Sequence, residues 1–229
     1  MLKAYKPRVF ATRDMIISTL KTMNKDSKKL QGLNHAADVK MSTEKYGPEK
    51  LPISYEVDYS DTNYVDFLGV EYDIVKSDLT GGDWFKYSDR KTTFHLQLFE
   101  KQKVDNEVDL PLAYIIPVEY QDVQEILKNH GIRYTITTKP QKIKIDTYKF
   151  SNQSWSPNSF EGRQMLPAFD MEEIRQELNF EAGAMVVPVR QQALKVIVYL
   201  LEPKADNSLV SWGFFNSSME RKEYAETYV

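Results

Sequence analysis

The period of the hydrophobic pattern changes at the segment "GPEKLP" (47–52), and this change constrains the fold more than any other feature. Before it, Val9, Ile16, Leu20 and Met23 recur at the spacing of one helix face. After it, apolar and polar residues alternate from Ile53 onward, as in a half-buried strand. Glycine and proline at the change interrupt both patterns. The sequence therefore predicts a helical segment over residues 1–46 and a β-rich domain over residues 53–229.

The segment before the change is expected to be helical in two parts. Pro7 suits the first turn of the first helix. The second part, "KDSKKLQGLNHAADVKMSTEKY", is predicted to continue the helix after a break near Gly32.

The part after the change predicts strands, one hairpin and a few helices. The Gly81-Gly82 pair is typical of a hairpin turn, and the residues 112–137 predict a strand, a helix and a strand in that order. The spacing of Asp170 and Glu173 suggests a capping box and hence a helix over 170–178. A buried strand at "AMVVPV" and a helix over 194–201 follow. The fold class is thus α+β, with mainly antiparallel sheet and packed helices.

Charge and composition exclude several classes of protein. The formal net charge is −3 and the pI is about 5.7, which gives no reason to expect a nucleic-acid partner. No apolar run is long enough for a membrane span, and the first residues lack the apolar core of a signal peptide. The chain has no cysteine, so disulfides, thiolate zinc sites and cysteine nucleophiles are excluded.

Few residues of the sequence are candidates for catalysis or metal binding. His35 and Asp38 are three apart on the predicted second helix, but a zinc site needs a third ligand. His95 is expected on the exposed side of a strand and His130 at the end of a helix. The sequence contains neither a nucleophile elbow nor a phosphate-binding loop. We therefore expect no catalytic, cofactor-binding or metal-binding residue in this chain.

The stretch "SLVSWGFFN", Ser208 to Asn216, concentrates aromatic residues near the end of the chain. Trp212, Phe214 and Phe215 are expected in a core, and Gly213 is expected to allow a tight turn or a close backbone approach.

The segment "LLEPKADNSLVSWGFFN" and the following "ERKEYAETYV" resemble the C-terminal end of bacterial zinc carboxypeptidase-like proteins. The segments "LKAYKPRVFATRD", "LAYIIPVEYQDVQEILKNHGI", "SFEGRQ" and "FEAGAMVVPVRQQALKVIVYLLEP" are similar to parts of the same proteins, in the same order. The resemblance implies an accessory domain that follows a carboxypeptidase A-type catalytic domain. It also implies a periplasmic or secreted location, and zinc in the catalytic domain only.

The chain departs from that family at the residues that perform catalysis. The His-x-x-Glu pair, the later histidine and the catalytic glutamate have no counterpart here. The resemblance therefore implies a non-catalytic module whose partner is a missing N-terminal catalytic domain of the same polypeptide. In that case part of residues 1–46 should expose an apolar face.

The alternative hypothesis is a module that binds cell-wall peptide or carbohydrate. It requires exposed aromatic rings in a shallow groove, and the ligand-facing candidates are Tyr64, Trp84, Tyr87 and Trp155. A third hypothesis, an enzyme with an unfamiliar site, requires a deep pocket with converging titratable groups.

Overall fold

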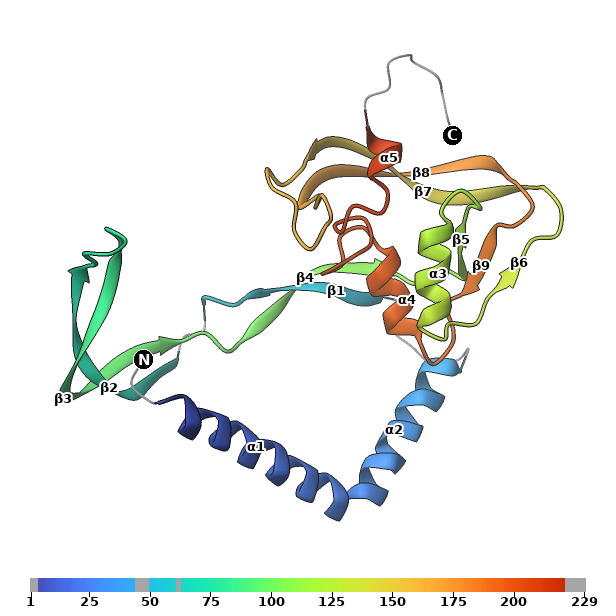
Figure 1. Cartoon of the computed structure of the whole chain (residues 1–229). Helices are drawn as coiled ribbons and strands as arrows, with labels where there is room; N and C mark the ends of the chain where they lie inside the picture. The colour runs from blue at the N-terminus through green and yellow to red at the C-terminus, as the bar shows by residue number, and fades with distance from the viewer. Residues whose placement is uncertain (1–3, 44–49, 61–62, 221–229) are drawn as a thin grey trace. The chain divides into compact units, whose positions relative to one another are not determined.

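The computed structural model describes residues 4–43, 50–60 and 63–220 of the chain (Figure 1). Its class is α+β, with two helices followed by mostly antiparallel sheets, as predicted. The chain divides into two units. We call Met1–His35 with Glu56–Lys103 the helix–ribbon unit, and Ala36–Tyr55 with Val104–Val229 the core unit. Half of the predicted boundary segment, residues 47–49, lies outside the described residues, as does the charged tail 221–229.

Two helices open the chain. Helix α1 spans Tyr5–Lys25, and α2 spans Ser27–Ser42. The prediction of a break near Gly32 is wrong, because α2 runs through this glycine and the helices meet at Asp26 instead. A glycine inside a helix costs only about 1 kcal/mol relative to alanine, so neighbouring residues can carry the helix through it.

Strands β2 (Asn63–Lys76) and β3 (Asp83–Leu98) form the long antiparallel hairpin of the helix–ribbon unit (Figure 1). The predicted Gly81-Gly82 turn joins them, and Gly81 has the positive φ of 68° that glycine tolerates. The register shifts between Val70 and Tyr72, which marks a bulge. No described residue of the helix–ribbon unit is buried.

Strand β1 (Lys50–Val57) pairs with β4 (Gln102–Asp109) in a second two-stranded ribbon. Leu51 and Ile53 of β1 are buried, and Ser54 Oγ donates a hydrogen bond of 2.9 Å to Asp105 Oδ2. The first residues of β1 thus belong to the apolar interior of the core unit.

The centre of the core unit is a three-stranded sheet with the order β5-β9-β6. The strands are β5 (Ala113–Ile116), β9 (Met185–Pro188) and β6 (Thr135–Ile136), and β9 is antiparallel to both neighbours. Helix α3 (Gln121–Asn129) connects β5 to β6, which confirms the predicted strand-helix-strand order. Helix α4 (Leu194–Leu201) follows β9, also as predicted.

Two buried clusters hold the core unit together. The first joins the sheet with α3, α4 and the C-terminal segment, through Ile116, Val123, Leu127, Ile132, Met185, Val187, Ile197 and Leu209. The second joins β1 to the start of α4, through Leu51, Ile53, Val189, Leu194, Val198 and Ala205. Burial of such side chains contributes about 1.5–3 kcal/mol each, so the core unit has a substantial hydrophobic interior.

The helix predicted over 170–178 is wrong, because these residues form strand β8 (Ala168–Phe180). Strand β8 pairs along almost its whole length with β7 (Gln141–Ser154), so long-range hydrogen bonds replace the local helical ones. Asp170 and Glu173 therefore cap no helix, and Asp170 Oδ2 instead accepts a hydrogen bond of 2.6 Å from Asn152. Lys142 and Lys144 are exposed on β7.

The aromatic segment 208–216 closes the core unit, before the short helix α5 (Asn216–Met219). Phe214 and Phe215 are half-buried and pack against the first buried cluster, while Trp212 is half-buried beside Phe160. Gly213 has φ 73°, and a Cβ atom on it would collide with the backbone oxygen of Gln164. The close backbone approach predicted at this glycine is confirmed.

Candidate functional site

The proximal part of the β2–β3 hairpin, residues 63–70 with 91–98, has one apolar and one polar face. Directly paired residues point to the same side of a sheet. The pairs Val65–Leu96 and Phe67–Phe94 therefore form the apolar face, and Phe94 lies over Gly69, where a Cβ atom would come within 2.7 Å of its ring. We call Val65, Phe67, Phe94 and Leu96 the ribbon apolar face. Phe67 is 57% exposed, so the described residues of the chain form no complete layer over this face.

The opposite face of the proximal hairpin is largely polar. The ring of His95 stacks on Tyr64 with the centroids 4.9 Å apart, and His95 Nδ1 lies 2.9 Å from Asp66 Oδ1. His95 is exposed, as predicted. Because these groups are well solvated, the arrangement stabilises the hairpin surface and forms no enclosed site.

Beyond the bulge, the hairpin carries an aromatic cluster. Tyr72 contacts Phe85 at 5.2 Å and Tyr87 at 6.2 Å between ring centroids, and Ile74 pairs directly with Phe85. All four side chains are exposed. Exposed aromatic rings in contact with one another are typical of surfaces that bind a protein or a ligand.

Helix α1 presents a narrow apolar stripe to solvent. Val9, Ile16, Leu20 and Met23 lie on one side of the helix, as predicted, and we call them the α1 stripe. Ile16 is 56% and Leu20 59% exposed, and α1 contains no buried residue. The apolar face expected in residues 1–46 is thus present and uncovered.

The four candidate ligand-facing aromatics do not form one platform. Tyr64 lies on the polar face of the proximal hairpin, and Tyr87 belongs to the cluster beyond the bulge. Trp84 pairs with Val75, whereas Tyr87 pairs with Tyr72, so Trp84 and Tyr87 point to opposite faces. Trp155 belongs to the core unit, where it is half-buried and donates a hydrogen bond of 3.2 Å to Asn216 Oδ1.

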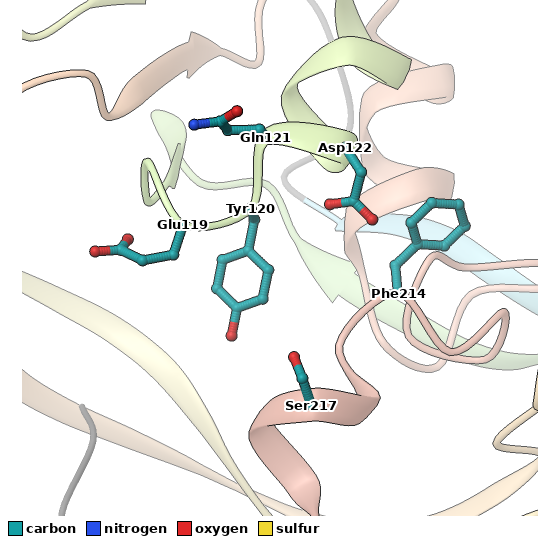
Figure 2. Close-up of a pocket in the computed structure, with 6 residues that line it drawn as sticks. All are labelled: Glu119, Tyr120, Gln121, Asp122, Phe214 and Ser217. Carbon is teal, nitrogen blue, oxygen red and sulfur yellow. The ribbon is translucent and has the colours of Figure 1, made fainter.

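A shallow cavity of about 480 Å³ lies in the core unit, at the start of α3 and α5. Its lining residues are Glu119, Tyr120, Gln121, Asp122, Phe214 and Ser217. Figure 2 shows the Tyr120 side chain pointing toward the helix that carries Ser217, with Glu119 and Gln121 directed away from Phe214.

Three of the groups around this cavity already have partners. Tyr120 hydrogen-bonds Ser218 and packs against Phe215 at 4.9 Å between ring centroids. Asp122 Oδ1 accepts a hydrogen bond of 2.8 Å from the Val123 N–H, and the Arg163 guanidinium lies 3.3 Å from the centre of the Phe214 ring. The Tyr120 contacts hold the C-terminal segment against the start of α3, so the cavity lies at the seam between these two packed elements.

The buried carboxylate of the core unit is Glu202, at the end of α4. It accepts hydrogen bonds from the hydroxyls of Tyr114 on β5 and of Tyr148 on β7, the latter at 2.8 Å. Burial raises the pKa of Glu202, and the two donated hydrogen bonds offset part of that rise. Burial together with the carboxylate also raises the pKa of both tyrosines. Because all three groups satisfy one another, we assign them a structural role that joins α4 to two strands.

The histidines occupy separate positions. His35 and Asp38 lie on α2, and the His130 ring Nδ1 lies 2.8 Å from the Ile126 backbone oxygen at the end of α3, where a helix end was predicted. In the described part of the chain no group of three or more metal-ligating side chains comes together.

Among the described residues, no helix combines the length and the apolar character needed to cross a membrane.

Sequence reasoning missed the Glu202 group and the extent of the exposed apolar surface. A single glutamate after an apolar helix gives no sign that two distant tyrosines will meet it. The alternation in "TTFHLQL" (92–98) predicts that Phe94, Leu96 and Leu98 share one face of a strand, as they do in β3, but it does not predict whether a second layer covers that face.

No protein-family model, curated protein or solved structure matches the chain.

Proposed function

We propose that the chain is a non-catalytic interaction module, in which the core unit is a stable body and the helix–ribbon unit supplies surfaces that pack against another protein. The observation that carries this proposal is the complete lack of buried residues among the described residues of the helix–ribbon unit. Isolated two-stranded hairpins are at best marginally stable in water, and single helices depend on packing of an apolar face. The unit therefore needs a partner to stabilise it.

The chemistry of the exposed surface indicates what kind of partner it needs. The α1 stripe and the ribbon apolar face consist of aliphatic and aromatic side chains, which gain free energy when they leave water. Contiguous exposed surfaces of this kind are typical of protein–protein interfaces. The module is thus proposed to act in assembly and to perform no chemical step.

The resemblance to zinc carboxypeptidase-like proteins offers one candidate partner, a catalytic domain on the same polypeptide. In that case the native polypeptide is much larger than 26.7 kDa and hydrolyses C-terminal residues of peptides in a zinc-dependent manner. An immunoblot of the source cells tests this candidate, and a band at the size of the chain alone removes it.

A peptide- or glycan-binding surface is the second candidate function, and the exposed contacts among Tyr72, Phe85 and Tyr87 favour it. Aromatic faces stack on sugar rings and on peptide side chains. Titration of the chain with peptidoglycan fragments, followed by tyrosine and tryptophan fluorescence, should then saturate, and Tyr87→Ala should weaken the response. A response unchanged by Tyr87→Ala argues against this candidate.

Limited proteolysis tests the interaction-module proposal. We expect a protease to cleave first within residues 5–35 or 63–98 when the chain is free, and to spare these segments when the chain is mixed with its partner. The core unit should survive in both samples. Equal resistance of both units in a demonstrably monomeric chain contradicts the proposal, because it shows that the helix–ribbon unit is stable without a partner.

A further inference from the structure

Basic residues are concentrated on the first two helices. Residues 4–43, which contain α1 and α2, hold eight Lys or Arg and three Asp or Glu, a net charge of +5. The whole chain has a net charge of −3, so the residues outside this segment together carry −8. Helix α1 itself holds five basic residues and one acidic residue. An exposed helix with this balance of charge attracts negatively charged surfaces.

The charged residues of α1 lie toward its two ends and leave its middle apolar. The basic residues are Lys6, Arg8 and Arg13 in the first half, and Lys21 and Lys25 near the end. The stretch "MIISTL" (15–20) between them contains no charged residue, and its Ile16 and Leu20 are exposed. A surface that covers α1 therefore meets apolar side chains in the middle and cations on both sides of them.

The cations at the start of α1 are unfavourable for the helix itself. The first turn contains Lys6 and Arg8 but no acidic residue, and no side-chain hydrogen bond caps the helix at Ala4. The free N–H groups at a helix start carry a partial positive charge, so cations destabilise this end. Each cation lies near a ring, 5.6 Å from Phe10 and 5.8 Å from Tyr5, but an exposed cation–π contact is weak. A residue choice that disfavours local structure is expected where the residues serve a partner.

A shallow hollow of about 510 Å³ lies on the same helix. Its lining includes four apolar or aromatic side chains and two arginines: Tyr5, Val9, Ile16, Ile17, Arg8 and Arg13. Arg13 pairs with Asp14 at 2.8 Å, but both side chains are more than half exposed, so this ion pair is weak and leaves the guanidinium able to bind another carboxylate. The hollow thus suits an apolar side chain that has a carboxylate beside it.

We propose that α1 binds an acidic amphipathic segment of another protein. Apolar side chains of this segment cover the α1 stripe, and its Asp or Glu residues reach the basic residues at both ends of the helix. This inference rests on the proposed interaction function. The apolar contact supplies the burial that α1 lacks. Carboxylates beside Lys6 and Arg8 offset the unfavourable charge of the first turn, and opposite charges fix the direction of the segment on the helix.

An anionic membrane is the other surface that a basic helix can bind, but two observations disfavour it. Val9, Arg13 and Ile16 are spaced four and three residues apart, so Arg13 lies among apolar side chains that would enter the lipid. A protein can place a carboxylate at that point, whereas the acyl chains of a membrane offer no partner for a cation. The net charge of −8 outside residues 4–43 would also be repelled by an anionic surface.

Binding of two synthetic peptides to the full chain tests the inference. The acidic probe is a fluorescent helical peptide of the length of α1, with leucine on one face and glutamate on both sides of that face. The basic probe has lysine in place of every glutamate. In fluorescence anisotropy we expect the acidic probe to bind saturably and the basic probe to bind at least about tenfold more weakly.

A charge-reversal variant assigns the binding to α1. Lys6→Glu together with Arg8→Glu should raise the dissociation constant of the acidic probe at least about tenfold. Negative charge in the first turn favours the helix, so this loss of binding does not come from loss of helix. Lys139→Glu together with Lys144→Glu is the matched control, because it makes the same change of charge at exposed residues of the core unit. It should change the dissociation constant by less than about twofold.

A second pair of variants tests the apolar contact. Ile16→Ala should weaken binding of the acidic probe about fivefold, since it removes part of the α1 stripe without lowering helix propensity. Met15→Ala is the matched control, because Met15 is also exposed on α1 but lies about 100° around the helix from Ile16. It should leave the binding of the acidic probe almost unchanged.

Three results overturn the inference. The acidic and basic probes bind equally well, or the acidic probe binds the Lys6→Glu, Arg8→Glu chain as well as the unmodified chain, or the chain sediments with phosphatidylglycerol vesicles but does not bind the acidic probe. Amide hydrogen exchange of the free chain separates this failure from failure of the proposed function. If α1 exchanges fast, only the acidic partner is wrong, since α1 still needs a covering surface. If α1 is as protected as α3 in a monomeric chain, both proposals are wrong.

Discussion

The two units of this chain differ in the interactions that stabilise them. In the core unit, α3, α4 and the β5-β9-β6 sheet bury large side chains such as Leu127 and Ile197 completely. In the helix–ribbon unit, α1 and the β2–β3 hairpin satisfy their backbone hydrogen bonds locally and bury nothing. The difference shows that regular secondary structure with an apolar face is not enough for independent stability. The stabilising free energy comes from burial of the apolar side chains on that face.

The largest expected effect compares a leucine from each unit. Leu127→Ala empties a fully buried site and should lower the free energy of unfolding by about 2–5 kcal/mol. Leu20→Ala removes a side chain that is 59% exposed and should change it by no more than about 0.5 kcal/mol in the free chain. Urea unfolding followed by tryptophan fluorescence measures both, and equal losses would remove the distinction between the units.

The next effect concerns the buried carboxylate of the core unit. Glu202→Ala leaves the Tyr114 and Tyr148 hydroxyls without their acceptor and should cost about 2–4 kcal/mol. Glu202→Gln keeps an acceptor for at least one of the two tyrosines and should cost less. If alanine and glutamine are equally tolerated in urea unfolding, the three groups do not join α4 to the strands.

The same residue predicts a dependence of stability on pH. Burial raises the pKa of Glu202 in the folded chain above its unfolded value. Between these two pKa values the folded chain binds a proton that the unfolded chain has released, so this contribution to stability is full below the unfolded pKa and falls as pH rises through the window. The stability of the wild-type chain relative to Glu202→Gln should therefore increase on acidification from neutral pH. A constant difference in unfolding midpoint from neutral to acidic pH contradicts the assignment.

A smaller effect distinguishes two glycines of the core unit. Gly213→Ala should cost about 2–3 kcal/mol, because a Cβ atom there meets the Gln164 backbone oxygen in addition to the strain of a positive φ. Gly131→Ala is the matched control, with a φ of 67° and no atom within 4 Å of the added Cβ, and should cost only about 1 kcal/mol. Thermal unfolding measures both. Equal losses of unfolding free energy from the two substitutions would show that the close backbone approach at Gly213 does not add to the effect of the positive φ.

The smallest effect belongs to the ribbon apolar face. Phe67→Ser should leave the unfolding of the core unit within about 0.5 kcal/mol of the unmodified chain, since Phe67 belongs to the helix–ribbon unit and is 57% exposed. Loss of core stability in circular dichroism would instead show that the hairpin contributes to the core.

The sequence correctly predicts the helices that have a local apolar pattern. It gives a wrong prediction for a segment whose structure depends on pairing with a distant strand. The periods at Val9 to Met23, at Val123 to Leu127 and at Leu194 to Leu201 correctly indicate helices, because one face of each is apolar. The residues 170–178 fit a capping box equally well, yet pairing with β7 makes them a strand. Local spacing cannot reveal a partner strand some thirty residues earlier in the chain.

The candidate surfaces were predictable only in part. Alternation in "TTFHLQL" correctly places Phe94 and Leu96 on one side, and the α1 stripe follows from its spacing. Exposure of these faces was expected for the helix but not for the hairpin. Burial of the apolar side chains of the hairpin depends on a second layer of structure. The residues of the hairpin itself do not show whether such a layer is present.

Amide hydrogen exchange of the free chain tests the central claim most directly. We expect the amides of α3, α4 and β9 to be protected, because their protection comes from the core. The amides of α1 and of β2–β3 should exchange much faster, because these elements have no buried side chains of their own. Protection of α1 and β2–β3 that equals that of α3 in a demonstrably monomeric chain would contradict the account, because the helix–ribbon unit would then be stable without a partner.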